Sequence, residues 1–218
     1  MFIGHFAPAF AAAAASPRAP RLATLFVAAQ LVDLGFFTFS LVGIEKMRIT
    51  PGATAMNPMD LYYMPYTHSM LGSAVWAVIF GLVIIAAYRD VGTGFIGAMV
   101  VFSHWILDFL VHRPDLTLAG GNVAYGLGLW NYPLIEIPLE LGITVGAFAW
   151  YMRWTRGPIG PPAILLAVML IFQAVNWFAP QPTEVGPFLY LQALLAYVIF
   201  IALARWVGNN RRHKRAQG

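Results

Sequence analysis

The chain contains no cysteine, and only 10% of its 218 residues carry a charge. Without thiols, disulfide bonds and thiolate metal sites are impossible, and nothing indicates the redox compartment. A soluble domain carries about 25% charged residues, so this scarcity excludes a soluble globular enzyme, a disordered chain and a nucleic-acid binder with a charged surface. The chain has 60% hydrophobic residues instead, with 15 prolines and 20 glycines, which indicates an integral membrane protein.

Apolar segments long enough to cross a membrane occur six times along the chain. Such a helix needs about 20 mainly apolar residues, and the segments that qualify are 22–44, 67–88, 92–112, 129–152, 161–178 and 187–207. The apolar stretch before Ser16 is shorter, so we expect a short N-terminal helix there, either re-entrant or spanning. The predicted fold is therefore an all-α, polytopic transmembrane helical bundle that forms a single integral-membrane domain, 1–218.

The basic residues predict the orientation of the bundle. Cytoplasmic loops carry an excess of Lys and Arg, and the chain ends in the basic run Arg211-Arg212-His213-Lys214-Arg215. If this tail, residues 211–218, is cytoplasmic, the alternation of spans also places Arg18, Arg21, Arg89, Arg153 and Arg156 on that side, and leaves Lys46, Arg48 and Arg113 outside. We interpret the tail as a topology anchor beside anionic headgroups, with a nucleic-acid or lipid-binding patch as the less favoured alternative.

Ionisable side chains within the predicted spans are few, and they share one depth in the outward half of the membrane. Each such group costs about 2.5–3.5 kcal/mol on insertion scales and by default indicates function. With the N-terminal helix included, the group consists of His5, Asp33, His68, His104, Asp108, His112, Glu136 and Glu140. All of them precede residue 153, so we expect a metal-site bundle in 1–152 and two further spans in 153–210.

The spacing of these residues suits metal binding. His104 and Asp108 are four residues apart and share one helical face, so one metal ion could bind both. Glu136 and Glu140 repeat this spacing, and Pro138 between them predicts a broken helix beside protein or a water-filled cavity. Histidine and carboxylate ligands without thiolate suit Zn²⁺, Mn²⁺ or Fe²⁺.

Structural interpretations compete with metal binding. The histidines and aspartates also suit interhelical hydrogen bonds, and His68 and His112 could lie at the water boundary. Glu136 and Glu140 fit such packing least, because no Lys or Arg lies at their depth. Unpaired carboxylates there must be protonated or coordinate something, so metal coordination is the favoured interpretation.

Four short motifs resemble a known family. Met1-Phe-Ile-Gly-His5-Phe, Leu-Val-Asp33, Tyr-Thr-His68-Ser69 and Ser-His104-x3-Asp108 together resemble the bacterial membrane-bound metal-dependent hydrolases of the YdjM-like group. More distantly, their order is similar to the all-α superfamily of zinc-dependent phospholipase C and single-strand nucleases, which cleave phosphodiesters with up to three zinc ions. The resemblance implies that the metal ligands are His5, Asp33, His68, His104 and Asp108. It also implies one or two metals rather than three, because Glu136-x3-Glu140 stands where the superfamily has His-x3-Glu.

The resemblance and the shared depth predict a metal-dependent hydrolase in the bacterial inner membrane. Its substrate would be an ester or phosphoester of a lipid-like molecule on the periplasmic side, its cofactor a divalent metal such as zinc, with Mn or Fe as alternatives. Glu136 or Glu140 would act as general base or bind a second metal.

The expected partners are membrane lipids and the lipid-like substrate, with no nucleic acid; a homo-oligomer or a larger membrane complex stays open. Two other functions stay open as well. One is a transporter or permease with an intramembrane His/carboxylate relay, and the other is a structural subunit of a larger membrane complex.

Overall fold

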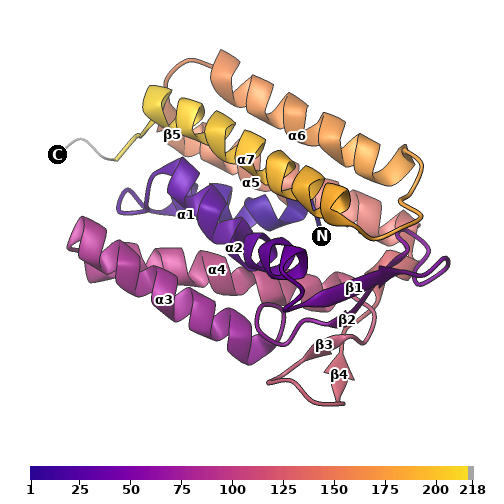
Figure 1. Ribbon diagram of the computed structural model, residues 1–218. Helices are drawn as coiled ribbons and strands as arrows, with labels where there is room; N and C mark the ends of the chain where they lie inside the picture. Colours follow the sequence, from indigo (N-terminus) through magenta and orange to yellow (C-terminus); the bar gives the residue numbers. More distant parts are fainter. Residues whose placement is uncertain (216–218) are drawn as a thin grey trace.

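The computed structural model describes residues 1–215, and most of these form helices that run along a common direction (Figure 1). Six helices are long and apolar enough to cross a membrane: α2 (Leu22–Leu41), α3 (Met70–Tyr88), α4 (Val91–Val111), α5 (Pro133–Trp154), α6 (Gly160–Phe178) and α7 (Pro187–Asn210). Their bounds lie within a few residues of the predicted spans, so the all-α bundle is confirmed. Residues 216–218 of the predicted basic tail lie outside the described residues.

The N-terminal segment is a short helix inside the bundle. It consists of the 3-10 turn η1 (Ile3–Phe6) and the helix α1 (Ala7–Ala15). Thirteen helical residues would reach about 20 Å, less than the hydrocarbon core of about 30 Å, so this segment is too short to span. Phe6 and Phe10 are fully buried, and α1 lies against α2 and α5.

The helices form three groups in Figure 1. The antiparallel pair α3 and α4 lies on one side, α5, α6 and α7 lie on the other, and α1 and α2 lie between them. Glycines allow α3 and α4 to approach closely, because a Cβ atom at Gly94 would lie 2.7 Å from the carbonyl oxygen of Gly81. The central position of α2 means that residues on its different faces can meet both outer groups.

Two hairpins cover one end of the bundle, opposite the C-terminus (Figure 1). Strand β1 (Lys46–Ile49) pairs with β2 (Met59–Tyr63), and β3 (Leu116–Thr117) pairs with β4 (Ala124–Tyr125). A short 3-10 turn, η2 (Leu129–Asn131), leads into α5. At the other end, β5 (Thr155–Arg156) pairs with β6 (Arg212–His213). Sequence analysis predicts only loops in these places, because strands of two to five residues carry too short a pattern to recognise.

Helix α5 is continuous through Pro138, so the predicted break is wrong. Pro138 lacks an N–H group and removes one hydrogen bond, to the carbonyl of Leu134. Leu134 belongs to the first turn of α5, so the lost bond lies at the edge of the helix and the following turns are intact.

Candidate metal centre

Two carboxylates and two histidines converge between α2, α4 and the start of α3. The Oδ1 atom of Asp33 lies 3.3 Å from Nε2 of His68 and 3.6 Å from Nε2 of His104. The Oδ2 atom of Asp108 lies 3.1 Å from Nε2 of His104 and 3.6 Å from Nε2 of His68. Ligand atoms of Asp33, His68 and His104 lie within 4.8 Å of one another, as do those of His5, His104 and Asp108, so either triad could hold a metal ion.

The facing atoms of His104 and Asp108 are not hydrogen-bonded to each other. Both atoms are buried, and neither has a hydrogen-bond partner although they lie 3.1 Å apart. A buried polar atom without a partner costs about 1–3 kcal/mol, so two such atoms side by side are available to bind a cation. Nitrogen and oxygen donors in this arrangement fit a divalent cation such as zinc.

In His104 and His68, Nδ1 is the outer ring nitrogen, which points away from the two carboxylates. A hydrogen bond to Nδ1 determines whether this nitrogen carries a hydrogen. Nδ1 of His104 lies 2.8 Å from the carbonyl oxygen of Ala29, which can only accept, so Nδ1 carries the hydrogen. Thr67 Oγ1 donates to Glu45 at 2.6 Å and therefore accepts from Nδ1 of His68 at 2.9 Å. In both rings Nε2 faces the carboxylates, as in metal-ligating histidines whose other ring nitrogen is hydrogen-bonded.

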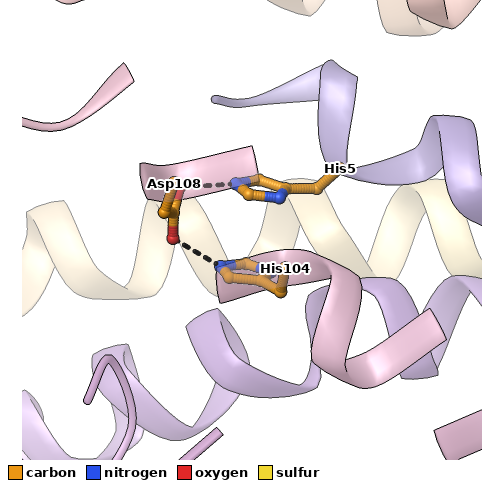
Figure 2. A group of neighbouring side chains, drawn as sticks. All are labelled: His5, His104 and Asp108. Carbon is orange, nitrogen blue, oxygen red and sulfur yellow. Dashed lines mark ion pairs between the residues drawn. The ribbon is translucent and has the colours of Figure 1, made fainter. Parts of the chain in front are cut away.

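The second oxygen of Asp108 faces a different set of groups. Its Oδ1 atom lies 2.9 Å from Nε2 of His5, 3.5 Å from Nε2 of His112 and 3.2 Å from the amino group of Met1. The rings of His5 and His104 are stacked 3.7 Å apart on one side of the carboxylate (Figure 2). Because its two oxygens serve two sets of donors, Asp108 could hold one metal or bridge two.

His112 is buried beside two carboxylates, and its predicted position at the water boundary stays a prediction. Its side chain is 3% exposed, and Nδ1 lies 2.8 Å from Oδ1 of Asp115. Burial lowers the pKa of His112, but the carboxylates of Asp108 and Asp115 outweigh this effect and raise the pKa to about 9. The two carboxylates therefore favour the protonated form of His112.

Glu140 lies outside this cluster and holds the N-terminal turn. Its Oε1 atom accepts hydrogen bonds from the backbone N–H groups of Phe2 (2.6 Å) and Gly4 (2.9 Å), and its Oε2 atom accepts from Nε2 of Gln173 (3.0 Å). The first N–H groups of a helix have no partner within the helix, so Glu140 supplies one from α5. These bonds fix the turn that carries His5.

Glu136, one helical turn before Glu140, has no such partners. Its side chain is fully buried, and neither carboxylate oxygen makes a hydrogen bond. The charged groups that act on it are Glu140 and the amino group of Met1, and Met1 also forms the ion pair with Asp108. The predicted roles of the two glutamates in catalysis stay predictions, but Glu136 is the one whose oxygens are available.

The last two spans contribute to the site, which sequence analysis did not anticipate. Tyr197 of α7 donates a hydrogen bond to Oδ2 of Asp33 at 2.9 Å, and Gln173 of α6 binds Glu140. Neither residue is recognisable from the sequence, because a tyrosine or glutamine in an apolar span has no distinctive pattern. The structure therefore places parts of 153–210 at the centre expected within 1–152.

An ion-paired carboxylate ties the two hairpin regions together next to the cluster. Asp60 of β2 is buried and pairs with Arg48 of β1 and with Arg113, the residue that follows His112. This contact connects the β1–β2 hairpin to the end of α4.

Comparison of the chain with family models, curated proteins and solved structures finds no match. The resemblance to the membrane-bound metal-dependent hydrolases therefore rests on the four motifs alone.

Proposed function

We propose that the chain is a metal-dependent hydrolase that cleaves an ester or phosphoester of a lipid-like substrate at the periplasmic side of a bacterial inner membrane. The observation that carries the proposal is the convergence of His68, His104, Asp33 and Asp108. Within this cluster, Nε2 of His104 and Oδ2 of Asp108 are buried without hydrogen-bond partners, and Nδ1 of each histidine is hydrogen-bonded. When bound, a divalent cation such as zinc, or alternatively manganese or iron, would polarise the phosphoryl or carbonyl oxygen and lower the pKa of a water molecule.

The side chains support distinct parts of this reaction. Asp33 is 14% exposed whereas His68, His104 and Asp108 are at most 3% exposed, so a substrate would reach the centre from the side of Asp33. Of the two glutamates, Glu136 is the one whose oxygens are free of hydrogen bonds, so it rather than Glu140 would bind a second metal or serve as general base once ionised.

The position of the centre favours an amphiphilic substrate. His104 and Asp108 lie in the half of α4 nearer its C-terminal end, and the hairpins cover that end of the bundle. The basic residues gather toward the opposite end, which the positive-inside rule assigns to the cytoplasm. A centre at this depth suits a molecule whose ester lies near the outer headgroups and whose chains remain in the bilayer.

Metal content of the detergent-purified protein tests the proposal. We expect mass spectrometry to find about one or two Zn, Mn or Fe ions per chain in the wild-type protein. The His104→Gln and Asp108→Asn variants should lose this metal. His213→Ala is the matched control, because His213 contacts the carbonyl of Ala14 away from the cluster. Hydrolysis of lipid phosphoesters should require the same residues. Wild-type protein that carries no metal, but whose activity follows a proton gradient, would favour the transporter instead.

A further inference from the structure

Tyr197 joins α7 to the candidate metal ligand Asp33. Its hydroxyl lies 2.9 Å from Oδ2 of Asp33 and must donate, because an ionised carboxylate can only accept. The other oxygen of Asp33, Oδ1, faces His68 and His104. One oxygen of the Asp33 carboxylate therefore binds Tyr197 on α7, and the other oxygen faces the two histidines of the cluster.

The phenol ring is held in place by aromatic neighbours on two other segments. Its centroid lies 6.1 Å from that of Phe2 and 6.2 Å from that of Phe37, with both pairs tilted. Tyr197 is buried, and α7 packs along α2, the helix that carries Asp33 and Phe37. Packing therefore determines where the hydroxyl lies, and the hydroxyl in turn restricts rotation of the carboxylate.

Asp33 needs this support more than the other candidate ligands. The outer nitrogens of His104 and His68 are anchored by Ala29 and by Thr67. Asp33 is more exposed than they are, and its hydrogen-bond partner outside the cluster, within residues 1–215, is Tyr197. Without the phenol, Oδ2 would be free to turn toward the exposed side.

We propose that Tyr197 is a positioning residue of the metal centre, which holds Asp33 so that Oδ1 faces His68 and His104. The inference rests on the proposed function, since it assumes that this cluster binds a metal. Helix α7 would then increase the metal affinity of the site through the hydrogen bond of Tyr197, in addition to packing against α2. Outer-shell partners of this kind contribute about 10–100-fold to metal affinity or activity.

The test measures zinc affinity of the detergent-purified full chain by competition with a chromophoric chelator. Tyr197→Phe removes the hydroxyl and keeps the ring, and we expect zinc to bind about tenfold more weakly. Tyr190→Phe is the matched control, because Tyr190 lies two turns earlier on α7, also packs on Phe37 and makes no hydrogen bond within residues 1–215. The unfolding temperature of the metal-free protein is measured for both variants, and we expect similar values.

A double-mutant comparison separates positioning from general packing. In the Asp33→Asn background, Tyr197→Phe should weaken zinc binding by much less than tenfold, because the carboxylate that it positions is gone. Equal zinc affinity in Tyr197→Phe and wild type, or an equal loss in both backgrounds, would overturn the inference while leaving the proposed function in place. Wild-type protein that binds no zinc, manganese or iron would overturn the proposed function and the inference with it.

Discussion

The Oδ1 atom of Asp108 lies 2.9 Å from Nε2 of His5, which connects α4 to the N-terminal turn of the chain. The Oδ2 atom of the same carboxylate faces His104 and His68. Asp108 is therefore the residue through which the two sets of candidate ligands are linked.

Removal of the metal should destabilise the wild-type protein but not Asp108→Asn. A ligand that binds only the folded state stabilises it by about 2.7 kcal/mol at a concentration one hundred times its Kd. We expect a chelator to lower the unfolding temperature of the wild-type protein in detergent. Asp108→Asn, which lacks the linking carboxylate, should unfold at the same temperature with and without chelator. An equal shift in both proteins would mean that the stabilising ion binds elsewhere.

Loss of the Glu140 carboxylate should loosen the N-terminal turn. Glu140→Ala leaves the N–H groups of Phe2 and Gly4 without their acceptor, and each unpaired buried donor costs about 1–3 kcal/mol. We expect lower stability to unfolding and faster hydrogen exchange at these two amides, with a smaller effect for Glu140→Gln, which keeps an acceptor oxygen. Glu184→Gln, an exposed glutamate, is the control. Unchanged exchange in Glu140→Ala would show that other groups hold the turn.

A side chain at Gly126 should disturb the end of α4. Gly126 has a φ of 153°, and a Cβ atom there would collide with the backbone carbonyls of His112 and Arg113. We expect Gly126→Ala to lower stability by about 1–3 kcal/mol or more and to weaken metal binding through His112. Gly121→Ala separates collision from backbone strain, because Gly121 also has a positive φ (91°) but open space around it. Similar losses in both variants would remove the collision from the explanation.

The cap of α4 should make stability depend on pH in the acid range. The side chain of Asp90 accepts hydrogen bonds from the N–H and hydroxyl groups of Thr93, and these bonds lower the pKa of Asp90. A carboxylate whose pKa is lower in the folded state contributes stability above its unfolded value, and this contribution is lost as the pH falls through the folded value.

The comparison that measures this effect is between wild type and Asp90→Asn. Asparagine keeps a capping oxygen without the charge, so the variant should lack this part of the pH dependence. We expect the two unfolding temperatures to converge as the pH is lowered from 6 through the usual carboxyl range of about 4 and below. A difference that stays constant over this range would exclude ionisation of Asp90 as the cause.

The six long apolar helices and the shared face of His104 and Asp108 could be predicted because both depend on local sequence. A run of about 20 apolar residues must form a helix in lipid to satisfy its backbone hydrogen bonds. Residues four apart on a helix then share a face without help from the rest of the fold. The positions of His104 and Asp108 relative to each other follow from this spacing.

The contacts that give the candidate site its detail depend on residues far apart along the chain. Glu140 and Gln173 hold the N-terminal turn, and Tyr197 holds Asp33. No periodicity in α6 or α7 predicts these contacts, because one polar side chain in an apolar helix can face any neighbour. His5 reaches Asp108 because α1, which directly follows the turn that carries His5, packs into the interior of the bundle.

The sequence by itself determined the six long apolar helices and the histidine and acidic side chains that lie four residues apart along them, because hydropathy and helical spacing are local properties. Only the tertiary structure decided which of these side chains meet. His5, Asp33, His68, His104, Asp108 and His112 form the cluster, while Glu140 caps a turn and Glu136 is left unpartnered. The physical reason is that the rotation and packing of each helix about its own axis depend on contacts with several other helices at once.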